Sequence, residues 1–82
     1  MILVDVYVPV YEKNYDMEID EDLSISMVIE EMANIICQKE ISKLRGRAEE
    51  LCLCDLQKEQ ILSPERCLRD YEIGSGGHLM LL

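Results

Sequence analysis

Basic residues are scarce in this sequence of 82 residues: 8 Lys and Arg stand against 17 Asp and Glu, which gives a formal net charge of −9. Proteins that bind nucleic acid or anionic lipid use clustered Lys and Arg to replace the counterions of the phosphates. An acidic chain repels both surfaces. The composition therefore disfavours nucleic-acid binding and membrane-surface attachment, and the length allows one compact domain with a single core.

Targeting and membrane-spanning segments are also lacking. The apolar run at residues 2–10 has no basic residues before it and is interrupted by Asp5, so it does not have the pattern of a secretion signal. It is too short to cross a bilayer. We expect a cytoplasmic protein without direct membrane insertion. In that compartment the cysteines stay reduced, whereas an exported protein with four cysteines would form two disulfides.

Residue sets for catalysis are missing as well. His78 is the only histidine, and it has no neighbouring Ser or Cys motif that would give a general base its partners. The glycine-rich segment 74–77 is not followed by a predicted helix, so it lacks the helix N-terminus of a phosphate-binding loop. We therefore expect no enzyme, no catalytic residue and no cofactor.

The cysteines leave one alternative open. Cys52 and Cys54 would point to the same face of a strand, and with Cys37 or Cys67 and His78 they could supply four zinc ligands. A C-x-C pair on a straight strand does not turn both thiolates toward one ion, and no basic residue adjoins Cys52 or Cys54 in the sequence to lower a thiol pKa. We expect small apolar fillers and no metal, with a metal-binding or redox domain as the alternative.

Alternating apolar residues predict strands in the first part of the chain. The pattern has a period of two at residues 2–10 and again at residues 15–20, and the polar segment 12–14 lies between them. Two such runs joined by a short polar segment are typical of an antiparallel hairpin. Pro9 has no amide hydrogen, so we expect the pairing to weaken there.

A helix is predicted next, beginning after Ser24, whose hydroxyl can cap the first turn, and ending near Gly46. Basic residues near its end oppose the helix dipole favourably, with a binding surface as the less favoured interpretation. They are Lys39, Lys43, Arg45 and Arg47. The apolar residues recur at intervals of three and four on one stripe. They are Ile25, Val28, Ile29, Met32, Ile35 and Ile36.

The last third of the chain returns to short strands. We expect a third strand at residues 51–56, a very short fourth at 61–62 and a last strand at 78–82. Residues 67–73 have apolar positions too irregular for a strand and predict a turn or a short helical piece, and residues 74–77 predict a loop. The order is strand, strand, helix, strand, short strand, last strand.

This order resembles the β-grasp topology of ubiquitin. Residues 67–73 and the strand after them resemble ubiquitin's Leu-Ser-Asp-Tyr-Asn-Ile segment and last strand, with the same spacing between Ile73 and Leu79. Residues 17–20, the Ser24 cap and the helix stripe resemble its second strand and helix. The resemblance implies an α+β, β-grasp (ubiquitin-like) fold, with a mixed sheet of four to five strands packed on one main α-helix, and residues 1–82 as a single ubiquitin-like domain.

The sequence is short and acidic, and in this it resembles the YukD/EsaB-like group of bacterial ubiquitin-fold proteins, which is associated with type VII secretion. That resemblance implies a non-enzymatic protein-interaction module, an accessory or regulatory component of a type VII-like secretion system that binds a protein partner. Ubiquitin and the sulfur carriers of the same fold act through a flexible tail ending in Gly-Gly, whereas here Gly76 and Gly77 precede the last strand and Leu82 is the last residue. Conjugation and sulfur transfer are therefore disfavoured, and a tail-less relative of such proteins is a further alternative.

The alternation also predicts a binding surface. If Leu79 and Leu81 enter the core, their neighbours on the last strand point to the other face of the sheet, and alternate residues of the first strand do the same. Because a β-grasp sheet places these two strands side by side, their outward residues predict an exposed patch for a protein partner, which an outward residue of the strand at 51–56 could extend. There are two alternatives. The patch could form a homodimer contact, or its members could be isolated exposed apolar residues of the kind that any small domain carries. The predicted partner-binding residues are Leu3, Tyr7, His78, Met80 and Leu82.

Overall fold

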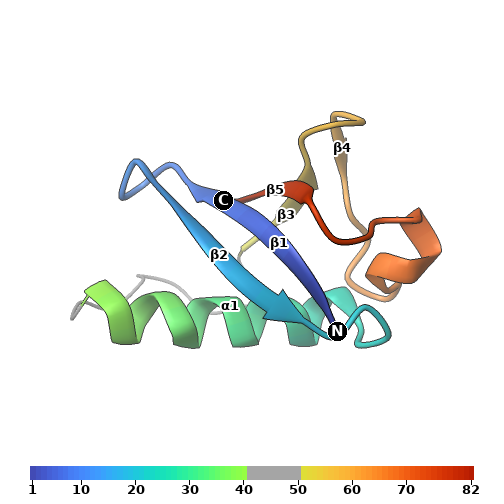
Figure 1. Ribbon diagram of the computed structural model, residues 1–82, viewed down its shortest axis with the longest axis horizontal. Helices are drawn as coiled ribbons and strands as arrows, with labels where there is room; N and C mark the ends of the chain where they lie inside the picture. The colour runs from blue at the N-terminus through green and yellow to red at the C-terminus, as the bar shows by residue number, and fades with distance from the viewer. Residues whose placement is uncertain (41–50) are drawn as a thin grey trace.

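The structure is a computed structural model that describes residues 1–40 and 51–82. Two long strands form a hairpin at the start of the chain, a helix follows, and three shorter strands complete the sheet (Figure 1). A single turn of 3₁₀ helix, Leu68–Tyr71, precedes the last strand. The main elements are β1 (Ile2–Val8), β2 (Lys13–Ile19), α1 (Ile25–Glu40), β3 (Leu53–Asp55), β4 (Gln60–Ile61) and β5 (Gly77–Leu81).

The five strands form one mixed sheet in the order β2-β1-β5-β3-β4. The central pair, β1 and β5, is parallel, and the other three pairs are antiparallel. The helix α1 runs along one face of the sheet (Figure 1). This arrangement confirms the predicted α+β class and β-grasp topology, with five strands. Among the described residues, no helix combines the length and the hydropathy needed to cross a membrane.

The core lies between α1 and the sheet because both elements bury the residues that their periodicity places on one side. In β1 the buried residues are Val4, Val6 and Val8, each no more than 1% exposed. The predicted helix stripe is buried except for Ile35, which is partly exposed. On β5, Leu79 and Leu81 point inward as predicted. The buried stripe residues are Ile25, Val28, Ile29, Met32 and Ile36.

The start of α1 is capped from two directions. Ser24 Oγ accepts a hydrogen bond from Met27 N–H at 3.4 Å, as the sequence predicts. The amides of Ile25 and Ser26 donate to the carbonyl oxygens of Arg66 and Pro64 at 2.7 and 3.1 Å, so a distant loop satisfies two further donors. The predicted helix end at Gly46, with Lys43, Arg45 and Arg47, falls outside the described residues.

The hairpin turn lies earlier than the sequence predicts. The strand β1 ends at Val8 instead of residue 10, because Pro9 cannot donate to a neighbouring strand and begins a turn. Tyr11 N–H donates to Val8 O, and Glu12 N–H donates to Pro9 O, both at 3.1 Å. Glu12 adopts a positive φ of 52°, and β2 then starts at once with Lys13.

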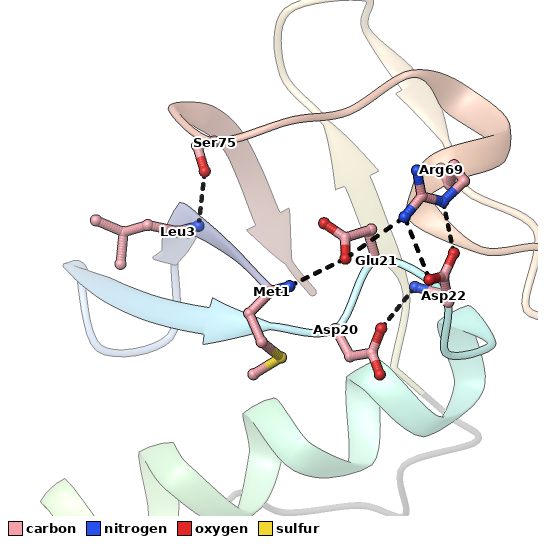
Figure 2. A network of polar contacts seen from close by, with 7 residues as sticks. All are labelled: Met1, Leu3, Asp20, Glu21, Asp22, Arg69 and Ser75. Atoms are coloured by element: carbon pink, nitrogen blue, oxygen red, sulfur yellow. Dashed lines mark hydrogen bonds and ion pairs between the residues drawn. The ribbon is translucent and has the colours of Figure 1, made fainter.

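The loop before β5 is fastened to the start of β1. Leu3 N–H donates to Ser75 Oγ at 3.2 Å, and Gly76 N–H donates to Leu3 O at 2.8 Å (Figure 2 shows the first of these). Gly76 has a φ of +90°, a conformation that favours glycine. The sequence places Gly77 in this loop, but it pairs with Val4 and is the first residue of β5.

Gly77 is packed too tightly to accept a side chain. A Cβ at this position would lie 2.9 Å from Ile73 Cγ2 and 3.2 Å from the Gly74 carbonyl oxygen. We expect Gly77→Ala to destabilise the fold by about 1–3 kcal/mol, because β5 or the loop must shift. Gly74→Ala is the matched control, since a Cβ there has no neighbour within 4 Å. Equal urea midpoints for the two variants would contradict this packing.

A network of charged groups ties three segments together at one end of the sheet (Figure 2). Arg69 Nε, in the 3₁₀ helix, binds Asp22 Oδ1 at 2.6 Å, and Arg69 Nη2 lies 3.7 Å from Glu21 Oε1. The same Glu21 oxygen lies 3.1 Å from the amino nitrogen of Met1. Glu21 and Asp22, in the loop between β2 and α1, are therefore paired with Arg69 of the 3₁₀ helix and with the amino group of Met1.

Two acids near this network have a lowered pKa. The hydrogen bond from Arg69 is the main cause for Asp22, and the hydrogen bond from the Cys67 backbone N–H is the main cause for Asp70. A lowered pKa stabilises the fold above the ordinary value of 3.8, and this contribution is lost as the pH falls below it.

The effect of Arg69→Gln should therefore depend on pH. We expect a small decrease in the thermal unfolding midpoint at neutral pH, because the paired side chains are exposed. The difference from wild type should shrink below about pH 4, where Asp22 becomes protonated and no longer attracts the guanidinium. Thermal unfolding followed by circular dichroism tests this, and a difference that grows in acid would contradict it.

Candidate functional site

One face of the sheet is not covered by α1. The outward positions of the strands alternate with the buried ones, so their side chains lie together on the side opposite the helix. We call this surface the outer face. Its residues are Leu3, Asp5, Tyr7, Asn14, Asp16, Glu18, Cys54, Ile61, His78 and Met80.

An apolar row crosses four strands of the outer face. In the strand register Tyr7 lies opposite Met80, Met80 opposite Cys54, and Cys54 opposite Ile61. Ile61 is 71% exposed, and the other three side chains are half-buried against one another. Opposing side chains on one face of a sheet lie about 4.5–5.5 Å apart at Cβ, so the row is contiguous. We call these four residues the apolar row.

Two other predicted partner-binding residues, Leu82 and Leu3, lie outside the apolar row. Leu82 follows β5 and is 53% exposed, and it exchanges two backbone hydrogen bonds with Cys52 at 2.8 and 2.9 Å. It therefore lies on the outer face two positions beyond Met80. Leu3 is 50% exposed but lies at the opposite end of β1, where it pairs with Glu18. Asp5 stands between Leu3 and the apolar row.

A polar row lies beside the apolar row, centred on Asp5. The register places Asp5 between Asp16 on β2 and His78 on β5. His78 Nδ1 lies 3.2 Å from Asp5 Oδ2, which is an ion pair when the imidazole is protonated. Asn14 Nδ2 lies 3.2 and 3.3 Å from the two oxygens of the same carboxylate. The carboxylate of Asp5 is thus held in a fixed position between two neighbouring strands.

The charge of the outer face is of one sign. Asp5, Asp16 and Glu18 are acidic, and no Lys or Arg occupies an outward position on the five strands described. Asp16 and Glu18 are exposed, and neither makes a hydrogen bond or ion pair within residues 1–40 and 51–82. The β2 side of the outer face is therefore acidic, and the β4 side is apolar.

The cysteines do not gather around a metal position. Their four side chains form no disulfide with one another. In the described part of the chain, three potential metal ligands come together only at Asp20, Glu21 and Asp22. Burial raises the pKa of the Cys54 thiol, and the charge of Cys52 adds to the rise. A raised pKa keeps Cys54 protonated at neutral pH and lowers its reactivity.

Alkylation rates can separate the two neighbouring cysteines. We expect iodoacetamide to modify Cys52 faster than Cys54 near neutral pH, because Cys52 is exposed and Cys54 is half-buried with a raised pKa. The single variants Cys52→Ser and Cys54→Ser, followed by mass spectrometry, report each rate. Faster modification of Cys54 would contradict this assignment and would favour the redox alternative.

Comparison with solved structures shows the same architecture in three ubiquitin-related folds. The ubiquitin-like domain of an Arabidopsis thaliana protein aligns with a TM-score of 0.73 at 18% identity, covering 99% of this chain and 74% of that one. The N-terminal ubiquitin-like domain of the 4931431F19Rik protein gives 0.76 at 16% identity, covering 99% and 72%. This chain has a ubiquitin-like fold. A design based on ubiquitin gives 0.72 at 17% identity, with 99% of this domain and 85% of the design covered. No protein-family model and no curated protein sequence matches the ubiquitin-like domain described here.

Several features of the outer face were not apparent from the sequence. An outward residue of the strand at 51–56 was expected to extend the patch, but which residue lies opposite Met80, and the further extension to Ile61, depend on strand register, which periodicity does not supply. The pairing of Asp5 with His78 depends on register in the same way.

Asp55 is an acid at a core position of the domain. It lies on the inner face of β3 and is 3% exposed. Its Oδ1 accepts a hydrogen bond from Gln57 N–H at 3.0 Å, which closes a turn after the strand. The alternation of Leu53 and Asp55 was the only sequence signal for this inward placement.

Proposed function

We propose that this ubiquitin-like domain is a non-enzymatic protein-interaction module that docks its outer face on a protein partner. The observation that carries the proposal is the apolar row, which lies on the side of the sheet opposite α1. Contiguous exposed apolar surface on a small domain marks an interaction site more often than single exposed residues do. Burial of such side chains at the centre of an interface supplies most of the binding energy.

We further propose that the domain serves in the cytoplasm of a bacterium as an accessory or regulatory component of a type VII-like secretion system. The support is the resemblance of this short, acidic domain of ubiquitin-like fold to the YukD/EsaB-like group. Neighbouring genes provide a direct test of this part. A membrane ATPase and small helical-hairpin substrates encoded beside it would support the assignment, and an unrelated gene context would count against it.

The docking surface is tested by a matched pair of substitutions. Met80 lies at the centre of the apolar row, and Met27 is 51% exposed on α1, on the other layer of the domain. Met80→Asp should abolish capture of the partner from cells of the source organism, because it puts a charge where apolar contacts form. Met27→Asp should capture the same proteins as wild type.

The readouts of this experiment distinguish the two parts of the proposal. Captured proteins are crosslinked to the domain and identified by mass spectrometry for each variant. If Met80→Asp and wild type capture the same proteins equally, the docking face is wrong. If Met80→Asp loses partners that do not belong to a secretion system, the docking face stands and the secretion role is wrong.

A further inference from the structure

The acids of this domain differ in how they are compensated. Asp22 and Glu21 are matched by Arg69 and by the amino group of Met1, as Figure 2 shows. Asp16 and Glu18 on β2 have no such match among the described residues. Uncompensated carboxylates fixed on a rigid strand are available to an incoming cation at no cost in internal ion pairs.

The uncompensated acids lie on one side of the apolar row. In the strand order β2-β1-β5-β3-β4, the acidic half of the outer face lies at the β2 end and the apolar half lies toward β4. The two halves meet at β1. Adjacent strands are about 4.8 Å apart, which puts β2 and β5 about 10 Å apart. A helix with its side chains is about 10–12 Å across, so one amphipathic helix can touch both halves.

We infer that the partner presents a helix whose apolar stripe is bordered on one side by Lys or Arg. This inference rests on the proposed docking function of the outer face. The apolar stripe contacts Tyr7 and Met80, and the cationic border faces Asp16 and Glu18 on β2. A partner with an acidic border would bring like charges together without a counterion on the outer face.

Charge also separates this occupant from two others. A second copy of the domain carries the same net charge of −9 and would bring a second acidic half to the interface. An anionic lipid surface meets the same repulsion. A cationic helix is the occupant whose charge complements the outer face, and its association should weaken as salt screens the acids.

Two labelled synthetic peptides test the inference on the whole domain. They share one apolar helical stripe, and the residues bordering it are Lys in one peptide and Glu in the other. Fluorescence anisotropy gives the affinities, and amide shifts of the isotope-labelled domain locate the site. We expect the Lys peptide to bind at least about tenfold more tightly than the Glu peptide, with shifts in β2, β1 and β5.

Isosteric charge removal provides the matched variants. The double variant Asp16→Asn with Glu18→Gln should weaken the Lys peptide by about fivefold or more and reduce its salt dependence. The control is Glu30→Gln with Glu31→Gln, which removes two exposed charges from α1 and should change affinity by less than about twofold. Met80→Asp should reduce the binding of the Lys peptide in the wild-type domain and in both double variants.

The outcomes distinguish failure of this inference from failure of the proposed function. Equal binding of the two peptides, or no effect of the β2 double variant, overturns the cationic border but leaves docking in place if Met80→Asp still weakens binding. Binding unaffected by Met80→Asp overturns the docking face itself. Failure of the Lys peptide to bind below about 1 mM overturns the inference, and self-association that Met80→Asp abolishes would identify a second copy as the occupant.

Discussion

Leu79→Asp should unfold the domain. Leu79 is fully buried at the centre of the sheet, where it lies opposite Val6 and Asp55. Loss of the leucine contacts costs about 2–5 kcal/mol, and burial of an unpaired carboxyl adds at least the roughly 2–7 kcal/mol that an unpaired amide or hydroxyl costs. A domain of this length has a total stability of about 4–12 kcal/mol. Circular dichroism at room temperature should show loss of the native spectrum.

Aspartate at the next position, in the variant Met80→Asp, is the control. Met80→Asp places the charge on the outer face, where it contacts water, and we expect a decrease of no more than about 1 kcal/mol because the methionine is only half-buried. Native-like spectra for Leu79→Asp, or unfolding of Met80→Asp, would show that β5 presents the opposite side to the core and would end the assignment of the outer face.

Leu68→Ala should destabilise the domain by about 2–5 kcal/mol. Leu68 begins the 3₁₀ helix and is fully buried in the core, although its segment is outside the sheet and α1. Two backbone hydrogen bonds of 3.1 Å fix this segment: Ile73 N–H donates to Leu68 O, and Arg69 N–H donates to Glu21 O. A cavity at this position therefore has little freedom to collapse. Urea unfolding at equilibrium measures the loss.

Leu82→Ala removes the same atoms from an exposed position and provides the comparison. Its side chain is 53% exposed, so we expect a change of less than about 1 kcal/mol. A similar, small loss for Leu68→Ala would mean that the segment before β5 is not part of the single core that the packing indicates.

Sequence periodicity predicted the parts of the fold in which one side of an element is buried. The alternation of Val4, Val6 and Val8 and the helix stripe beginning at Ile25 both record contact with the same core. The inward orientation of Leu79 followed from the same rule. The displaced hairpin turn shows where the rule is weaker, because the exposed residues 9–12 carry no burial pattern and the turn depends on Pro9 and a positive φ at Glu12.

The composition of the outer face was less accessible from sequence. Periodicity assigns each residue to a face but does not align one strand with another, and register decides which side chains become neighbours. Tyr7 and Met80 were expected to be close because β-grasp sheets pair their first and last strands. An extension of that pair by the third strand was also expected, but its identification as Cys54 and its continuation to Ile61 required the register of β5, β3 and β4.

The parallel pairing of β1 with β5 has a consequence for how the domain is made. Asp5 and His78 are 73 positions apart, so forming the middle of the sheet closes a loop with an entropic cost of about 4 kcal/mol. On the ribosome, β1 is synthesised first but has no central partner until β5 has left the exit tunnel. We expect the nascent chain to remain without the central strand pair of its sheet until then, so that folding is completed only after β5 has emerged from the tunnel.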